Sequence, residues 1–487
     1  MTRAGITRRS LLAAVGATAA CASGTGSTMP PRSGPALDPA LLEVITEAST
    51  DELHEALHRV RADGVDTLLL AVHDLAVRDL VPARLFRRPH HALLVVPAVR
   101  EVVRRVPASD GWVAVVWAIE YLRRARATDR GFVLVPLQSR ELPRAADAEA
   151  ELGDALHGYD AHRADRAITA LVRAGARDRA VQRLLHHGSQ DFREIGHKLI
   201  HVVQGLRGVV GRDDVATEAA MRAMVFTLTL HDHPVGHLSD DTWGPNLARG
   251  RTLDVDVDAG KDVTATMLEN LRGAGVDDAA VEAIVWLGRG ATTQSIWDAV
   301  SLFAAELMFN NPDSVEAMHA VTATDAARAA FARLESRETR ATALLQAVAR
   351  VADFRDYAGH WARLRGDAPA SAIAVETLAP RSGSVELAGL VAGFSAADVG
   401  VRIEIAERTL AYASGETQAQ ELVHAAIEQL PIRVVDDAHD YKLTIAVRDE
   451  SRRIAPRWRA HYLALCTSRL CSSGRPTSEL AHRVARV

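Results

Sequence analysis

A histidine and a lysine lie three residues apart near the C-terminus, at His439 and Lys442. The chain has only three lysines, the others being Lys198 and Lys261, and arginine supplies every other basic residue. A lysine that persists against this bias indicates a need for an amine, which can lose its proton or be modified at nitrogen. Because residues three apart share a helix face, we interpret the pair as part of a metal site. Lys198 has a similar setting, directly after His197.

Other histidines lie inside apolar segments with helical spacing. These are His91, His197, His201 and His319. His197 and His201 are four residues apart, so they share one face of a helix. Burying several imidazoles without partners is costly, and a shared metal ion would satisfy them together. For each histidine taken alone, a hydrogen-bonded core residue is the competing interpretation.

A second histidine cluster, His231, His233 and His237, lies at the start of a segment rich in proline, glycine and aspartate, residues 232–262. A metal site in such a loop needs support from outside it. A solvated loop is the alternative interpretation.

Glu306 is the one acid in the apolar run 303–308, which makes it a candidate for acid–base catalysis or for orienting a metal ligand. An ion pair between helices, with an arginine, is the alternative. Trp117 and Trp297 are candidates to line a pocket for an aromatic substrate, with core packing as the alternative for each.

The elements that position these residues are predicted to be helices. Aromatic residues make up only 5% of the chain, and alanine, valine and leucine dominate, which favours helix over sheet. Apolar residues recur at steps of three and four from about residue 39. The clearest helical segments are 111–124, 166–185, 279–287, 296–309 and 341–354. Only residues 131–137 and 400–406 have a β-like pattern, and the second also fits the start of a helix.

We therefore predict a single large, all-α, multi-helix domain over residues 39–487, with long loops at 232–262 and 365–398. A signal segment and linker, residues 1–38, precede it. Arg8 and Arg9 stand before a short apolar run, which is typical of a Tat signal. The predictions are export by the Tat machinery, a periplasmic or extracellular location, and membrane attachment only if Cys21 carries a lipid. Tat export moves folded proteins, often with a cofactor already inserted.

Charge and cysteine content exclude some classes of function. A net charge of −5 gives no electrostatic case for binding nucleic acid. Cys466 and Cys471 are five residues apart and point to different helix faces, so we predict neither a disulfide nor a thiolate metal site. The sequence lacks a C-x-x-C-H motif, which argues against covalently bound haem.

Several segments, taken in order, resemble one family. They are 89–94, 191–198, 296–308, 318–322 and 439–442. Together they resemble bacterial, Tat-exported relatives of the questin oxidase-like family, and the resemblance extends from about residue 60 to residue 465. Characterised members are fungal oxygenases that open rings, or carry out Baeyer–Villiger-like steps, on anthraquinone-type polyketides.

The resemblance implies an all-helical oxidoreductase that holds non-haem iron, Fe(2+), and uses O₂ as co-substrate. Carried over to this chain, the metal ligands are His91, His197, His319, His439 and Lys442, the lysine carboxylated by carbon dioxide. His201 stays open as a replacement for His197, and Lys198 for Lys442. Adjacency to His197 turns Lys198 about 100° away on a helix, which favours Lys442.

The ligand types suit the implied metal. Imidazole binds iron(II) well, and a carbamate supplies a hard anionic oxygen. Carbamylation needs a neutral amine, which an apolar site and a nearby cation favour. Asp440 or Glu194 would orient imidazoles as hydrogen-bond acceptors. The expected substrate is an aromatic or quinone-like small molecule. The alternative function is that of a non-catalytic, exported helical binding protein for a small apolar ligand.

Overall fold

The computed structural model describes residues 43, 45, 46, 49, 53, 55, 56, 64–81, 88–128, 133–191, 194–230, 243–365, 373–381, 383, 385–415, 417–434 and 437–484. These residues contain twenty α-helices, two short 3-10 helices and no β-strand, so the predicted all-α class is confirmed. The predicted signal segment with Cys21, and the cluster of His231, His233 and His237, lie outside the described residues.

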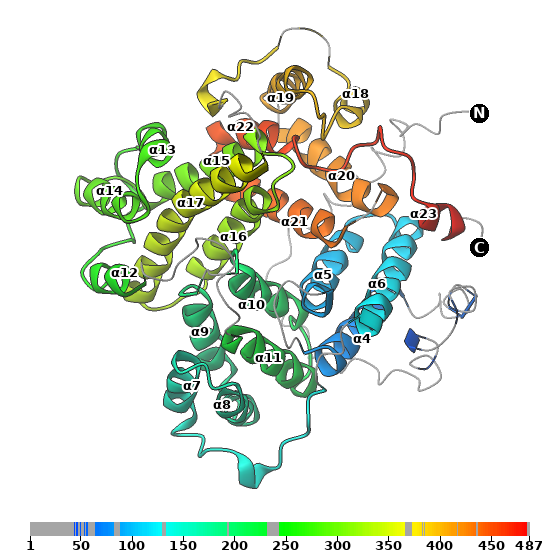
Figure 1. Cartoon of the computed structure of the whole chain (residues 1–487), viewed down its shortest axis with the longest axis vertical. Coiled ribbons are helices and arrows are strands. Elements are labelled where there is room, and N and C mark those ends of the chain that lie inside the picture. Colours follow the sequence, from blue (N-terminus) through cyan, green and yellow to red (C-terminus); the bar gives the residue numbers. More distant parts are fainter. Residues whose placement is uncertain are drawn as a thin grey trace.

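The α-helices follow one another from residue 65 to residue 484 (Figure 1). In chain order they are α4 (Val65–Asp79), α5 (Arg88–Val103), α6 (Ala108–Thr128), α7 (Ala148–His157), α8 (Ala161–Arg173), α9 (Arg177–Gly188), α10 (His197–Gly208), α11 (Asp214–Thr229), α12 (Trp243–Gly250), α13 (Thr264–Gly273), α14 (Val276–Gly288), α15 (Thr293–Asn310), α16 (Val315–Phe331), α17 (Arg337–Arg365), α18 (Leu387–Ala392), α19 (Val399–Ala413), α20 (Thr417–Val434), α21 (Ala438–Arg453), α22 (Pro456–Cys466) and α23 (Glu479–Val484). The 3-10 helices are η3 (Ser139–Glu141) and η4 (Val375–Thr377).

Side-chain caps fix where several helices begin. An aspartate, serine or threonine just before the first turn accepts a hydrogen bond from a backbone N–H of that turn, which would otherwise lack a partner. The capping residues are Asp160, Asp213, Thr292, Ser314, Asp398 and Asp437. Two of these helices, α16 and α21, carry candidate metal ligands.

The predicted helix over 166–185 is wrong in one respect, because the chain breaks there into α8 and α9. Gly175 has a φ of 71° and ends α8. The amide of Ala176 donates to the carbonyl of Leu171, and that of Gly175 to Val172, which is the paired bonding of a glycine C-cap. The apolar spacing continues across this glycine, so periodicity alone gave no sign of the break.

The β-like runs do not form strands. Residues 400–406 lie inside α19, as the helical alternative predicted, and residues 133–137 are extended without strand pairing to any described residue. The predicted loops also contain helices: α12 lies within 232–262, and η4 and α18 lie within 365–398. α12 packs against α17, where the Asn246 side chain donates to Gln346 over 2.8 Å. A short helix of this kind depends on tertiary packing rather than on periodicity.

Four helices form a ring at the centre of the molecule. α5 packs against both α10 and α21, and α16 packs against the same two helices from the other side. Figure 1 shows these four helices together near the centre of the molecule, although in the sequence they are spread from residue 88 to residue 453. A closed arrangement of this kind brings side chains from distant segments to one point, as in metal sites built inside helix bundles.

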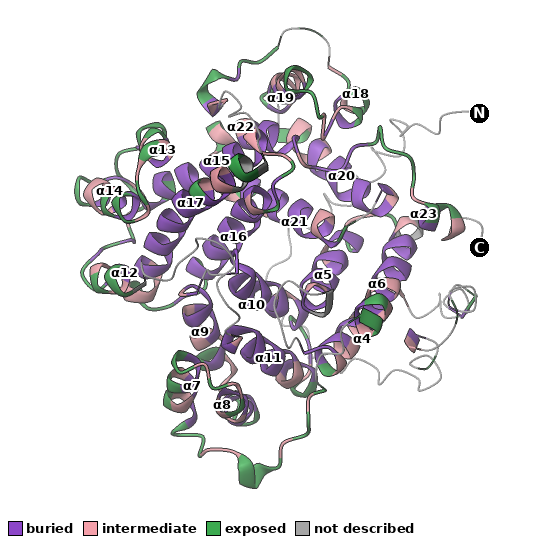
Figure 2. Cartoon of the chain, in the orientation of Figure 1, coloured by how far each residue is buried: buried purple, intermediate pink, exposed green. Residues whose placement is uncertain are grey.

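The remaining helices cover the ring from outside. α4 and α6 pack on α5, α9 and α11 on α10, α15 and α17 on α16, and α20 and α22 on α21. Buried residues consequently occupy nearly the whole circumference of the central helices, whereas exposed residues lie on the outer ones (Figure 2). A helix with apolar residues all round belongs to the core of a large protein.

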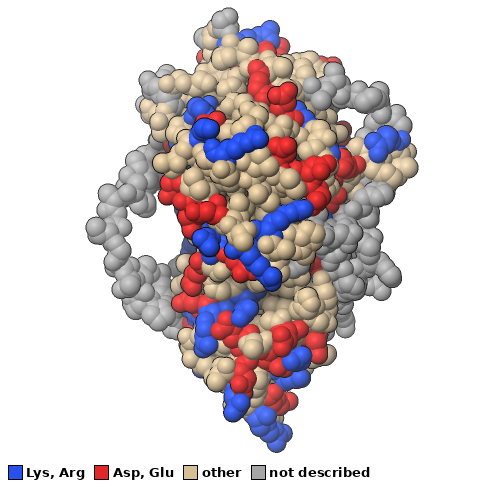
Figure 3. Space-filling model, turned by 90° about the vertical axis from the view of Figure 1, so that its left-hand side faces the viewer, with Lys and Arg blue, Asp and Glu red and all other residues tan. Residues whose placement is uncertain are grey.

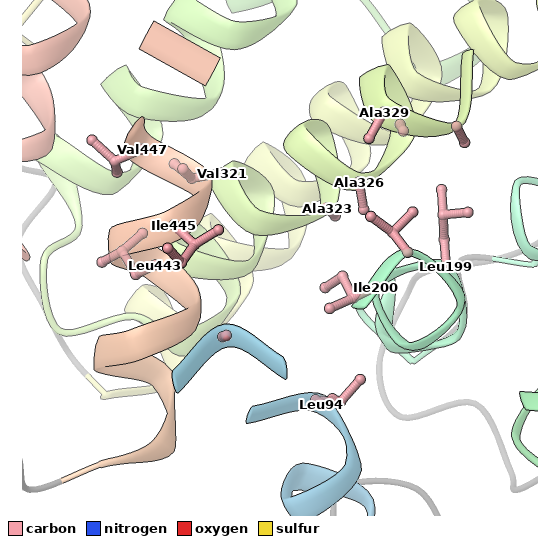
Figure 4. Packing of buried hydrophobic residues seen from close by; sticks show 14 of the residues in the cluster. Leu94, Leu199, Ile200, Val321, Ala323, Ala326, Ala329, Leu443, Ile445 and Val447 are labelled. Atoms are coloured by element: carbon pink, nitrogen blue, oxygen red, sulfur yellow. The ribbon is translucent and has the colours of Figure 1, made fainter. Parts of the chain in front are cut away.

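Apolar side chains fill the space between the central helices (Figure 4). Leu94, Ile200, Val321 and Leu443, one from each helix of the ring, are all almost completely buried. Burial of each large aliphatic side chain contributes about 1.5–3 kcal/mol.

The exterior carries charges of both signs. Basic and acidic side chains are interspersed over the face in Figure 3. Among the helices of the described part of the chain, none has both the length and the apolar character that crossing a membrane requires.

Candidate metal centre

His197 is the first residue of α10, and the turn before it fixes its ring. Ile195 and Gly196 have left-handed backbones with φ of 50° and 80°. This turn brings the carbonyl of Glu194 within 2.8 Å of His197 Nδ1. A carbonyl can only accept, so Nδ1 carries the proton and Nε2 keeps its lone pair. Metal-binding histidines generally have such a partner on the other nitrogen.

His439 is oriented in the same way by a different group. Asp437 caps α21 through the amide of His439, and its carboxylate also accepts from His439 Nδ1 at 2.8 Å. Nε2 of His439 is inaccessible to solvent and has no hydrogen-bond partner among the described residues. Burial alone would raise the pKa of Asp437, but the bonds from His439 lower it below its usual value. Asp437 therefore orients His439. Of the two acceptors predicted for this role, Asp440 and Glu194, Glu194 orients His197, through its backbone carbonyl.

The first turn of α5 contributes two adjacent histidines. The His91 ring lies 5.2 Å from that of His197 and 5.0 Å from that of His439, measured between centroids. The His90 ring lies 5.3 Å from His197 and 5.4 Å from His201. His90 is fully buried, and neither of its nitrogens has a hydrogen-bond partner among the described residues.

His319 comes from the middle of α16 and is also fully buried. Its ring centroid is 4.4 Å from that of His197 and 5.4 Å from that of His439. Neither nitrogen has a hydrogen-bond partner within the described part of the chain. Two lone imidazoles without partners, His90 and His319, are a costly arrangement in a protein core unless something further binds to them.

The four predicted imidazoles thus meet at one place. The donor nitrogens of His91, His197 and His439 all lie within 4.8 Å of one another. Nitrogen ligands at about 2.0–2.1 Å from an ion must lie within about 4.2 Å of each other. A small inward movement of these side chains would therefore complete a coordination shell, so the residues present fit a first-row metal ion.

Lys442 lies one turn after His439 on α21, and its side chain is buried. Burial lowers the pKa of Lys442 to about 7, although Asp437 opposes this shift. Nζ has no hydrogen-bond partner among the described residues. After burial, Lys442 in its charged form is the largest influence lowering the pKa of His319. A lysine with this pKa is the neutral amine in about half of the molecules near pH 7.

The rival lysine has a different environment. Lys198 is fully buried and donates to Asp191 over 2.5 Å, with Glu194 Oε2 at 3.9 Å. The amine of Lys198 is thus already bonded to a carboxylate, whereas that of Lys442 has no hydrogen-bond partner among the described residues. This environment favours Lys442 as the lysine of the centre.

His201, the alternative to His197, is not one of the three histidines whose donor nitrogens lie close together. His201 Nδ1 lies 2.5 Å from the hydroxyl of Thr227 on α11. Its ring is near His90, and it is absent from the group of three close donors. The position of the cluster therefore favours His197.

Burial lowers the pKa of His197, His319 and His439, so these imidazoles are neutral at neutral pH. Burial holds the pKa of His197 well below its usual value, and the neighbouring His319 and His91 lower it further. Burial likewise lowers the pKa of His439. Neutral imidazoles keep the lone pair that binds a metal ion.

The carboxylate of Glu306 binds an arginine. Its carboxylate forms a two-point ion pair with Arg272, at 2.8 and 2.7 Å, and accepts from the amide of Val375. The ion-pair alternative describes this geometry, and a catalytic role for Glu306 stays a prediction.

The two tryptophans pack against other rings. The ring centroid of Trp117 lies 5.0 Å from that of Tyr441, which directly precedes Lys442. The ring centroid of Trp297 lies 5.4 Å from that of Phe331. Cys466 and Cys471 are buried and form no disulfide among the described residues, and burial raises the pKa of the Cys466 thiol.

Sequence reasoning missed His90 and Asp437. His90 directly precedes a predicted ligand inside the same apolar segment, which was a usable signal. Asp437 stands at the N-cap position of a helix, and capping aspartates are predictable from sequence, but its second bond to His439 is not.

Comparison with known proteins gives no relative. No protein-family model matches the chain, and neither the curated proteins nor the solved structures give a significant match. The resemblance to the questin oxidase-like family therefore stays a prediction.

Proposed function

We propose that this protein is a metal-dependent oxidoreductase of the oxygenase type, with non-haem iron held by His91, His197, His319, His439 and Lys442. The substrate is a small aromatic or quinone-like molecule. This substrate class comes from the segment resemblance, whereas the metal site has support from the geometry.

One observation carries the proposal. Helices far apart in sequence bring donor nitrogens of His91, His197 and His439 within 4.8 Å of one another, and the His319 ring packs against those of His197 and His439. His319 and Nε2 of His439 have no protein hydrogen-bond partner among the described residues. Buried polar groups are normally satisfied, so a cluster of unsatisfied nitrogens calls for a ligand. Imidazole donors without thiolates suit iron better than calcium or magnesium.

The bound metal would supply one-electron redox chemistry with O₂, which amino-acid side chains alone do not provide. The chain's own residues perform the remaining tasks. Asp437 and the Glu194 carbonyl hold the tautomers of His439 and His197 with Nε2 free. The neutral amine of Lys442 takes up carbon dioxide, forming a C–N bond and releasing one proton, and so presents an anionic oxygen.

Metal analysis of the purified protein tests the proposal. After anaerobic loading with iron(II) we expect close to one equivalent of iron per chain, and His319→Ala and Lys442→Ala should each reduce it to less than a tenth. ¹³C-labelled bicarbonate should give a carbamate resonance in the wild type and none in Lys442→Ala. Oxygen uptake with a reduced hydroxyanthraquinone then tests the reaction class.

Matched controls separate a specific loss from general damage. His162 on α8 and Lys261 are exposed, so His162→Ala and Lys261→Ala should retain iron. Absence of any bound transition metal in the wild type, after aerobic and anaerobic preparation, would contradict the proposal. Unchanged iron content and spectrum in both site variants would favour the non-catalytic binding protein instead.

A further inference from the structure

A second polar cluster includes Lys198, which directly follows His197 at the start of α10. Lys198 donates to Asp191 Oδ2 over 2.5 Å, and the hydroxyl of Tyr159 donates to the same oxygen over 3.0 Å. The ammonium also lies 5.0 Å from the centre of the Tyr159 ring. The side chains of Lys198 and Asp191 are fully buried.

Two strained backbones flank this ion pair. Only three described residues other than glycine have a positive φ, and two of them are Tyr159, at 56°, and Ile195, at 50°. A β-branched residue such as isoleucine rarely adopts this conformation, which persists only where the surroundings enforce it. The Tyr159 side chain bonds to Asp191, and Ile195 lies three residues before Lys198.

The strained turn has a direct consequence for His197. It brings the Glu194 carbonyl to both the amide of His197, at 3.0 Å, and its Nδ1, at 2.8 Å. The ion pair anchors this turn at both ends, because Asp191 precedes it and Lys198 follows it.

We propose that Lys198 is a positioning residue: its buried ion pair with Asp191, braced by Tyr159, holds the turn that fixes the tautomer and direction of the His197 ring. The consequence for metal binding rests on the proposed function, but the effect on the ring does not. The inference also gives a second reason for a retained lysine. The ammonium is a compact point charge, and a planar guanidinium is not interchangeable with it at a fully enclosed position.

The test uses the full chain with ¹⁵N-labelled histidine and no metal. Asp191→Asn/Lys198→Met replaces the ion pair with neutral groups of similar size, which avoids an uncompensated buried charge. Long-range ¹H–¹⁵N correlation, with His197→Gln for assignment, should report the Nδ1–H tautomer in the wild type and a mixture in the double variant. Cobalt(II) affinity, followed by visible absorption, should fall by roughly tenfold to a hundredfold.

The matched control removes another buried ion pair, between Arg222 of α11 and Asp165 of α8. The control variant is Asp165→Asn/Arg222→Met. That variant should lose stability but keep the His197 tautomer and the cobalt affinity. A folded Asp191→Asn/Lys198→Met variant with the wild-type tautomer would overturn the inference. If the tautomer changes as expected but the wild type binds no metal, Lys198 positions the His197 ring as inferred and the proposed function is wrong.

Discussion

The chemistry of each imidazole depends on the atom bonded to its second nitrogen. In His439 that atom is a carboxylate oxygen of Asp437, and in His197 it is the backbone oxygen of Glu194. Acceptors of this kind fix the tautomer and raise the basicity of the free nitrogen. Lys442 differs, because burial without a hydrogen-bond partner among the described residues favours its neutral form.

We predict that Asp437→Ala damages both the helix cap and the metal centre. Loss of the cap should lower the free energy of unfolding by about 0.5–2 kcal/mol. Loss of the bond to His439 Nδ1 should weaken metal binding by roughly tenfold to a hundredfold. Chemical denaturation and metal titration measure the two effects separately.

Asp213→Ala is the matched control, because Asp213 caps α11 without contacting a histidine. It should cost a similar amount of stability and leave metal affinity unchanged. Equal metal affinities in Asp437→Ala and the wild type would show that the Asp437 carboxylate has no role at the centre.

At the scale of elements, the centre depends on how closely α5 and α10 approach. Gly208, the last residue of α10, faces Pro97 of α5 and His73 of α4. A Cβ added at Gly208 would lie 2.8 Å from two ring atoms of His73 and 3.4 Å from Pro97 Cγ. Glycine at this position permits the contact between these helices.

We predict that Gly208→Ala lowers the free energy of unfolding by about 1–2 kcal/mol. Overpacking costs about 1–3 kcal/mol, and the better helix propensity of alanine offsets up to about 1 kcal/mol of it. A shift of α10 that relieves the contact with His73 should also weaken metal binding, because α10 carries His197. Gly273→Ala in α13 meets no atom within 4 Å and should be neutral or stabilising. Equal stability of both variants would contradict this account of the contact.

At the scale of the whole molecule, an unusual number of histidines is buried in the neutral form. His73, His187 and His201 lie outside the set of proposed ligands, and burial lowers the pKa of each to about 3. The charge of Arg212 adds to the shift of His73, and that of Lys198 to the shift of His187. The usual value for histidine is 6.5, so each group titrates very differently in the folded and unfolded chain.

We predict that acid destabilises the fold below about pH 6.5. Above that pH these histidines are neutral in both states, so they cause no pH dependence. Below it the unfolded chain binds protons that the folded chain cannot bind until about pH 3. Each histidine should therefore remove about 1.4 kcal/mol of stability per pH unit in that window.

Urea denaturation in the presence of a chelator, between about pH 7 and pH 5, measures this loss without interference from metal binding. His187→Gln should show a shallower pH dependence than the wild type, because one of the three groups is gone. A transition midpoint that does not move over this range would contradict the prediction.

The sequence by itself determined the helical class and most helix positions, because apolar spacing and caps act over a few residues. It also indicated the histidines, and a lysine at either Lys442 or Lys198, since these residue types stand out in apolar segments. The choice of Lys442 came from helix geometry and from the segment resemblance. Where periodicity runs on across a local break, as at Gly175, it gave no sign of the helix end.

Only the tertiary structure decided which of these residues meet. His91, His197, His319 and His439 come together because four helices far apart in sequence close into a ring, and no local pattern encodes that closure. The same packing separates the two lysines, since Lys198 meets Asp191 while Lys442 meets no acceptor among the described residues. Burial and partners, not residue type, set the chemistry of each amine.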